Sequence, residues 1–190
     1  FSEVSVSRKR DRGFSEVYTL FDYIEETVGQ DKLDKQVLGL LRNVSRWKES
    51  PTGLRMAKYI IQNRISEGYQ IVYDYITNGC RNNGYLAEQM IKSDIMVEEI
   101  KAVSDKMEKS LQLVVYATVC KDLGDEYWVK EKLEPQIHIF EGYQQIQALR
   151  ILLGIGSMKA LAYIVEQSEL LNDYREYNFC FSDVNAATLL

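Results

Sequence analysis

The sequence predicts an all-α protein whose helical hairpins stack into a right-handed α-solenoid. Three observations support this fold class. Apolar residues recur every three or four positions along most of the chain, and no stretch shows the period-two alternation of a half-buried strand. Only 2 of the 190 residues are proline. A segment in the second half also repeats after 32 residues, which indicates stacked units of supersecondary structure.

The first part of the chain is expected to be a polar leader followed by a helix. Residues 1–13 carry a basic cluster among polar residues, typical of a solvated linker, and residues 14–190 are expected to form a single helical-repeat domain. An amphipathic stretch begins near Tyr18 and is expected to end at Gly29. Because the chain begins with Phe and stops inside what is expected to be the opening of another helix, the apolar tail at residues 184–190, we interpret it as a fragment of a larger protein.

Helical signals continue through the middle of the chain. Ser50 followed by Pro51 is a helix-start signal, and residues 57–76 resemble a weak copy of the later repeat. Residues 78–104 are expected to be an inserted loop with one extra helix. One buried helical face is predicted before Ser50, from the apolar residues Leu33, Val37, Leu40, Leu41 and Val44.

The repeat itself aligns residues 116–134 with residues 148–166. Each copy is expected to be a helix, a glycine in the left-handed conformation, and an N-cap residue that opens a second helix folding back on the first. One hairpin cannot bury its apolar face alone, so successive hairpins are expected to stack. The residues in the two turns are Gly124 with Asp125 and Gly156 with Ser157.

The second copy resembles a known repeat family. Residues 152–165 read LLGIGSMKALAYIV, which resembles the HEAT and armadillo pattern at Ile155, Gly156, Ser157, Ala160, Leu161 and Ile164. The resemblance is best over residues 105–171, and it implies a right-handed superhelix that binds other proteins. Such irregular repeats are also similar to the helical arms of NACHT-type signalling NTPases.

Composition excludes several classes of site and partner. With 1 His and 3 separated Cys, the chain cannot supply a multi-histidine metal site, a zinc cage or a disulfide framework. We therefore expect no metal and no cofactor, and cysteines held reduced in the cytoplasm. A net charge of −5 disfavours nucleic acid, and no apolar run approaches the roughly 18 residues of a membrane span.

No motif in the chain predicts catalysis. The Gly154–Gly156 segment lacks the third glycine and the Lys-Ser/Thr pair of a phosphate loop. Every histidine-based constellation would have to use His138, which Pro135 separates from the nearest helical carboxylate. Adjacent carboxylates point about 100° apart on a helix and generally mark solvated faces. A small all-α enzyme that uses clustered carboxylates remains an alternative.

A partner-binding surface is predicted on the second helices of the two copies. Val129 and Leu133 are expected to point inward, and their equivalents Leu161 and Val165 likewise, with Ile164 and Ser168. The opposite side mixes tyrosine with charge, as binding interfaces do. Tyr163 has an alternative interpretation as packing between repeats, and Trp128 is expected in the core. The predicted partner-binding residues are Tyr127, Glu131, Glu134, Lys159, Tyr163 and Glu166.

These features predict a non-catalytic interaction or scaffold module. Its partner would be a protein or peptide segment, or another domain of the same polypeptide. The second hypothesis is a regulatory sensor arm of a larger NACHT-type NTPase, in which intramolecular contacts dominate. Residues 61–190 carry a net charge of −7, so we expect a charged partner to meet an acidic surface.

Overall fold

The computed structural model describes residues 27, 29–42, 47–80 and 82–167. Within these residues the chain is helical and contains no strand, which confirms the all-α prediction. The α-helices are α2 (Gln30–Leu41), α4 (Pro51–Gln62), α5 (Tyr69–Thr77), α6 (Asn83–Lys92), α7 (Val97–Val103), α8 (Lys109–Thr118), α9 (Glu126–Leu133), α10 (Gly142–Gly154) and α11 (Met158–Glu166). Four short turns of helix join them: η1 (Ser66–Gly68), η2 (Ser104–Lys106), η3 (Val119–Leu123) and η4 (Glu134–Ile139).

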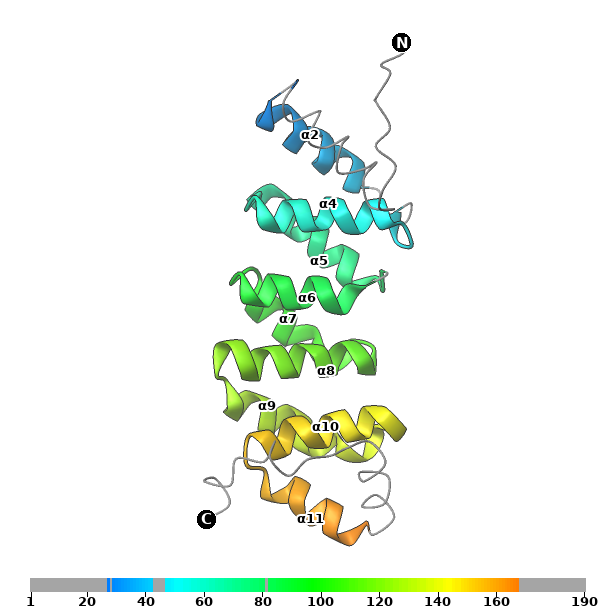
Figure 1. Ribbon diagram of the computed structural model, residues 1–190, viewed down its shortest axis with the longest axis vertical. Coiled ribbons are helices and arrows are strands. Elements are labelled where there is room, and N and C mark those ends of the chain that lie inside the picture. The colour runs from blue at the N-terminus through cyan, green and yellow to red at the C-terminus, as the bar shows by residue number, and fades with distance from the viewer. Residues whose placement is uncertain (1–26, 28, 43–46, 81, 168–190) are drawn as a thin grey trace, which may run out of the picture.

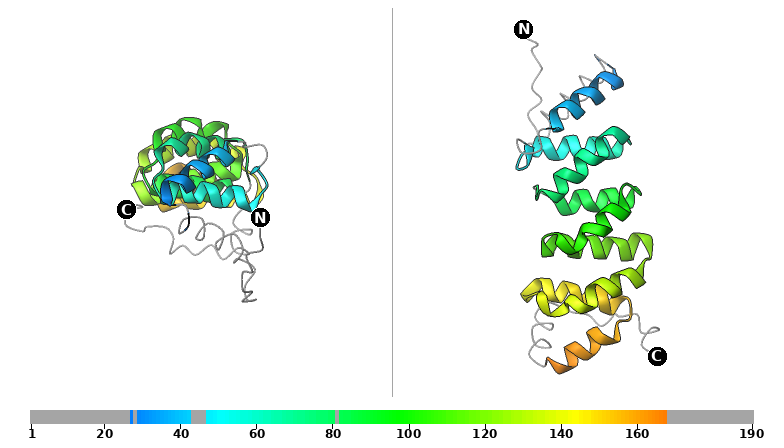
Figure 2. Two further views of the ribbon diagram at one scale, coloured as in Figure 1. Left: turned by 90° about the horizontal axis from the view of Figure 1, so that it is seen from above. Right: turned by 180° about the vertical axis from the view of Figure 1, so that it is seen from behind.

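The helices follow one another along the long axis of the molecule in chain order, from α2 at one end to α11 at the other (Figure 1). They form four hairpins, α4–α5, α6–α7, α8–α9 and α10–α11. The first helices of these hairpins make a continuous row, because α4 contacts α6, α6 contacts α8 and α8 contacts α10. Seen from above, the helices lie over one another within one footprint (Figure 2).

One continuous apolar core runs through the stack, and every α-helix contributes to it. Its bulkiest fully buried side chains include Tyr75, Tyr116 and Phe140. The predicted face before Ser50 is confirmed for three residues, because Leu33, Val37 and Leu41 of α2 are buried.

The prediction is wrong for Leu40, which is half exposed. Seven residues after Leu33, it lies at the edge of the buried face of α2, and its carbonyl oxygen accepts a hydrogen bond from Trp47 Nε1 at 2.8 Å.

The predicted helix starts are confirmed by their capping hydrogen bonds. Ser50 Oγ accepts from Thr52 N at 3.1 Å, and Pro51 occupies the first position of α4. Asp125 caps α9 and Ser157 caps α11, each by accepting a hydrogen bond from the backbone N–H three residues on. These side chains satisfy N–H groups that the first turn of a helix leaves without a partner.

The chain reverses within each hairpin at a residue in the left-handed conformation. These residues are Arg64, Asp94, Gly124 and Gly156, with φ between 52° and 69°. Asp94 lies 30 residues after Arg64, Gly124 lies 30 after Asp94, and Gly156 lies 32 after Gly124. The turns of the four described hairpins are therefore spaced 30 to 32 residues apart.

The expectation of an inserted loop and one extra helix over residues 78–104 is wrong. This region holds a full hairpin, α6–α7, and α6 packs between α4 and α8. Its turn has the same closing hydrogen bond as two others: the N–H groups of Ile65, Ile95 and Ser157 each bond the carbonyl oxygen five residues back. No glycine signals this turn in the sequence, because its left-handed residue is Asp94.

Several predicted segments lie outside the described residues. They are the leader over residues 1–13, the amphipathic stretch from Tyr18, Val44, Ser168, and the apolar tail near residues 184–190. Among the helices that are described, none is long and apolar enough to cross a membrane.

Candidate partner-binding surface

The rotation of α9 is fixed at its start. Gly124 closes the preceding turn in the left-handed conformation, and Asp125 Oδ1 then accepts from Trp128 N at 3.2 Å. With α9 anchored in this way, Val129 and Leu133 are fully buried. Tyr127 points out of the stack with 80% of its side chain exposed, and Glu131, one turn further on, is exposed as well. Both residues lie where the sequence predicted, and their role in binding stays a prediction.

Glu134 does not share this outer surface, contrary to expectation. α9 ends at Leu133, and Glu134 begins the short turn η4, which leads the chain toward the next hairpin. Its carboxylate accepts a hydrogen bond from Ser157 Oγ at 2.6 Å and lies 3.1 Å from Lys159 Nζ. Only 15% of the Glu134 side chain is exposed. Glu134 therefore joins the end of α9 to the start of α11.

The predicted residues on α11 divide between surface and packing. Lys159 and Glu166 are exposed, as expected. Tyr163 is half-buried against the core, and its hydroxyl oxygen accepts a hydrogen bond from Gln145 Nε2 of α10 at 3.0 Å. Tyr163 therefore packs within its own hairpin and does not lie in an open groove, and the alternative interpretation, packing between repeats, stays a prediction.

The inward side predicted for α11 is only partly buried. Ile164 is buried, as predicted. Leu161 is half-buried, and Val165 is 68% exposed, so the expectation that Val165 faces the core is wrong. No hairpin that follows α11 is among the described residues, so nothing in this part of the chain packs over Val165.

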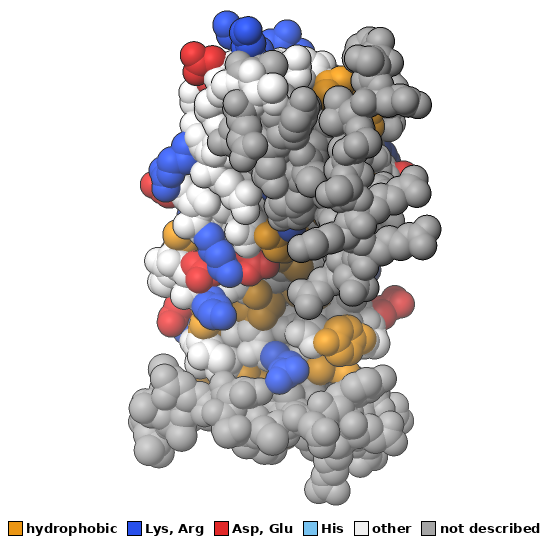
Figure 3. Space-filling view, turned by 45° about the horizontal axis from the view of Figure 1, so that its top comes forward, with side chains coloured by type: hydrophobic (Ala, Val, Ile, Leu, Met, Phe, Trp, Pro, Cys, Tyr) orange, Lys and Arg blue, Asp and Glu red, His pale blue; other side chains and the backbone are white. Residues whose placement is uncertain are grey.

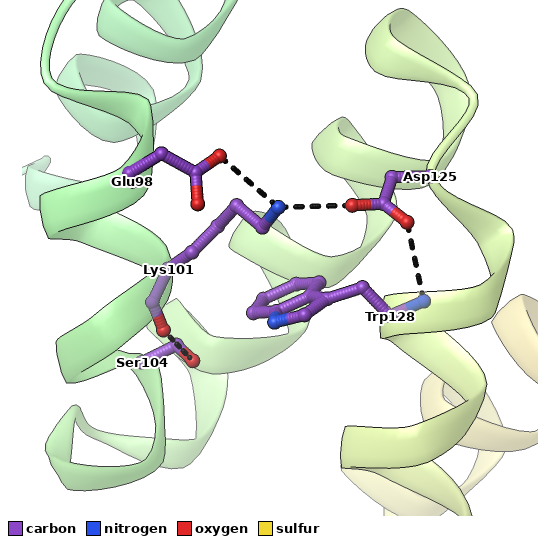
Figure 4. Close-up of polar contacts among 5 residues, drawn as sticks. All are labelled: Glu98, Lys101, Ser104, Asp125 and Trp128. Atoms are coloured by element: carbon purple, nitrogen blue, oxygen red, sulfur yellow. Dashed lines mark hydrogen bonds and ion pairs between the residues drawn. The ribbon is translucent and has the colours of Figure 1, made fainter.

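A second polar junction, between α7 and α9, was not predicted. Lys101 Nζ lies 2.9 Å from Asp125 Oδ2 and 3.2 Å from Glu98 Oε1, and 5.0 Å from the centre of the Trp128 ring (Figure 4). Trp128 packs in turn against Tyr116, with ring centres 5.4 Å apart; it is half-buried at the border of the core, so its predicted core position is confirmed only in part. Lys101 and Asp125 are 24 residues apart, so no local pattern in the sequence indicates the contact.

At these two junctions, hydrogen bonds and ion pairs stabilise the charged forms of Asp125, Lys101 and Glu134. The hydrogen bond from Lys101 lowers the pKa of Asp125. Burial opposes the charge on Lys101, but hydrogen bonds to Asp125 and Glu98 outweigh it and raise the pKa of the lysine. Burial likewise opposes the charge on Glu134, and its bonds with Ser157 and Lys159 still lower the pKa of the carboxyl. These carboxylates stay ionised in ion pairs, unlike a general acid, whose pKa must be raised.

A third junction centres on Asp105 in the turn η2. Its carboxylate accepts hydrogen bonds from Tyr116 Oη at 3.0 Å, Lys132 Nζ at 2.8 Å and Gln136 Nε2 at 3.2 Å. Burial disfavours its charge, but these three donors outweigh that effect and lower the pKa of Asp105. Together the three junctions connect the second helices of successive hairpins through side chains distant in sequence.

On α6 and α8, a shallow depression of about 220 Å³ is lined by Val114, Ala117, Thr118, Glu88, Lys121 and Asp122. At its edge Lys92 pairs with Glu88 and lies 4.0 Å from Asp122. One face of the stack shows hydrophobic side chains beside acidic and basic ones (Figure 3). The depression is too open and too small to bury a drug-sized ligand, whose pockets usually exceed about 300 Å³.

The described cysteines and the histidine do not form a reactive or metal-binding site among the described residues. Burial raises the pKa of Cys80 to about 12, and burial also raises the pKa of Cys120. A raised pKa leaves little thiolate, which is the nucleophilic form. His138 is exposed, and residues 27–167, where described, hold no group of three or more potential metal ligands.

The fold over the described residues defines the class of this chain as an all-helical protein of stacked hairpins. In comparisons with known proteins, no family model, no curated protein and no solved structure matches it.

Proposed function

We propose that this chain is a non-catalytic interaction module, a right-handed α-solenoid of the HEAT and armadillo type that binds a segment of another protein. The exposure of Tyr127 carries the proposal. A large aromatic ring gains free energy when it is buried, so an exposed ring has apolar surface available for a partner. Tyrosine is also enriched where one protein binds another. On α9 the neighbouring apolar residues are buried in the core, whereas Tyr127 projects away from it.

The charges beside Tyr127 indicate the kind of partner. Glu131 is exposed one turn along the same helix, and no hydrogen bond or ion pair of its side chain is found in the described structure. Glu166 is exposed at the end of α11, whereas Lys159 is held by Glu134. The outer surface of α9 therefore presents an aromatic ring with an available carboxylate. A basic segment with an apolar side chain has the complementary chemistry.

The test compares two exposed tyrosines. Tyr127→Ala is measured against the matched control Tyr143→Ala, because Tyr143 is also exposed but belongs to another helix, near the start of α10. The probe is an array of immobilised 15-residue peptides of basic, neutral and acidic composition, with apparent Kd measured for those that bind. We expect wild type to bind basic peptides that contain apolar residues, and Tyr127→Ala to weaken them about thirtyfold, as a hot-spot residue does.

Two readouts separate binding from folding. The melting temperature of Tyr127→Ala should match that of wild type, and Glu131→Lys should weaken the basic peptides selectively. Equal binding by Tyr127→Ala and Tyr143→Ala would contradict the proposal, as would wild-type binding to none of the peptides. A marked fall in melting temperature would instead assign Tyr127 to the packing of the stack.

A further inference from the structure

The helices α9 and α11 occupy equivalent places in successive hairpins, yet one face of α11 lacks the cover that α9 has. Both helices start from a left-handed glycine and a capping side chain, so positions 32 residues apart correspond. Val129 and Leu133 of α9 are fully buried. Their equivalents are Leu161, which is half-buried, and Val165, which is mostly exposed.

α9 packs against elements on both sides of it in the chain. It contacts η3, which precedes it, and it also contacts η4 and α10, which follow it. For α11, the equivalent of η4 and α10 would come from the residues after Glu166. Met158 extends the exposed apolar face by nearly one turn, and we call Met158, Leu161 and Val165 the α11 strip; they are spaced by three and four residues.

We propose that the α11 strip is the docking site for residues 170–184 of this same chain. These residues lie outside the described structure, and they are joined to α11 through Gln167 and two further residues. Their sequence repeats apolar side chains at spacings of four and three, the pattern of one helical face. The side chains in that pattern are Leu170, Tyr174, Tyr177, Phe181 and Val184.

The physical basis is mutual burial of two apolar faces. An isolated amphipathic segment of about 15 residues is marginal in water, and it gains most of its stability by packing an apolar face against a partner. The α11 strip offers such a face at the next place in a stack whose neighbours already pack in chain order. This contact uses α11, whereas Tyr127 lies on α9, so the proposal can be tested separately from peptide binding.

Hydrogen–deuterium exchange on the full chain tests the proposal. Val165→Asp places a charge in the strip, and Gln167→Asp is the matched control, with the same charge change just past the helix end. We expect wild-type amides in residues 170–184 to exchange slowly, and Val165→Asp to speed their exchange by at least about tenfold, since a docked segment opens locally. Phe181→Asp should give the same acceleration from the other side of the contact.

The results distinguish docking of residues 170–184 on the α11 strip from docking of a second copy of the chain. Sedimentation should show a monomer for wild type and for all three variants. A wild-type dimer that Val165→Asp dissociates would make a second copy of the chain the occupant and overturn the proposal. It would also fail if residues 170–184 of wild type exchanged at the rate of an unstructured chain, or if Gln167→Asp accelerated them as much as Val165→Asp. Unchanged exchange in α4–α8 shows that the stack itself stays folded.

Discussion

The turns that open α9 and α11 are built alike, but the two helices differ in what surrounds them. In both, a left-handed glycine precedes a side chain that caps the helix, at Asp125 and Ser157. On α9, Val129 and Leu133 are fully buried and the helix contacts η4 and α10 that follow it, whereas on α11 Val165 is exposed. The comparison teaches that local chemistry sets where a helix starts and how it is rotated. The chain that follows decides which of its faces is buried.

The largest expected difference between the two helices concerns their matched apolar residues. Leu133→Ala should lower the free energy of unfolding by about 2–5 kcal/mol, because Leu133 is fully buried and its loss leaves a cavity. Val165→Ala should lower it by less than about 1 kcal/mol, since contacts at the edge of the stack open locally. Urea unfolding followed by circular dichroism measures both. Equal losses would show that the two positions are buried alike.

A smaller difference is expected between the two capping residues. Ser157→Ala should cost about 2 kcal/mol, because Ser157 Oγ both accepts from Ala160 N and donates to Glu134. Asp125→Ala should cost about 1 kcal/mol, the usual value for a lost cap. Asp125→Asn is the control, because asparagine caps as well as aspartate but lacks the charge that pairs with Lys101. If Asp125→Asn were as damaging as Asp125→Ala, the ion pair and not the cap would stabilise α9.

The smallest effects are expected from the pH dependence of the junctions at Asp125 and Glu134. Asp125 and Glu134 have pKa values below their usual range in the folded chain. Their charged forms therefore stabilise the fold above the unfolded pKa of about 4, and this contribution is lost as pH falls through the folded pKa.

Thermal unfolding from neutral to acidic pH measures this effect. Glu134→Gln should reduce the fall of the melting temperature at acidic pH more than Asp125→Asn does. The reason is that the Glu134 side chain is less exposed, so water and salt screen its ion pair less. If the melting temperature of Glu134→Gln fell more steeply with acid than that of wild type, the charged Glu134 carboxylate would not stabilise the fold.

The parts of the structure that could be predicted are those that depend on neighbours in sequence. Ser50, Asp125 and Ser157 cap helices because a short polar side chain reaches N–H groups two or three residues away. The apolar spacing predicted the buried side of α2, apart from Leu40. In each case the interacting groups lie within about one helical turn of each other.

The errors concern residues whose surroundings come from elsewhere in the chain. Glu134 was expected to face outward, but Ser157, 23 residues later, draws its carboxylate into a junction. Tyr163 was expected in an open row, but Gln145 of the neighbouring helix binds its hydroxyl. The hairpin α6–α7 was missed because Asp94 adopts a left-handed conformation that glycine takes most readily.

The all-α fold, the starts of the capped helices and the glycine turns follow from the sequence alone. Helical periodicity and capping depend on residues only a few positions apart, so the order of residues along the chain is enough to predict these features. Contacts between distant segments decide that residues 83–103 form a hairpin of their own, that Lys101 reaches Asp125, and that Tyr127 is exposed whereas Tyr163 is half-buried. Burial depends on how successive hairpins pack, and that packing joins residues more than 20 positions apart.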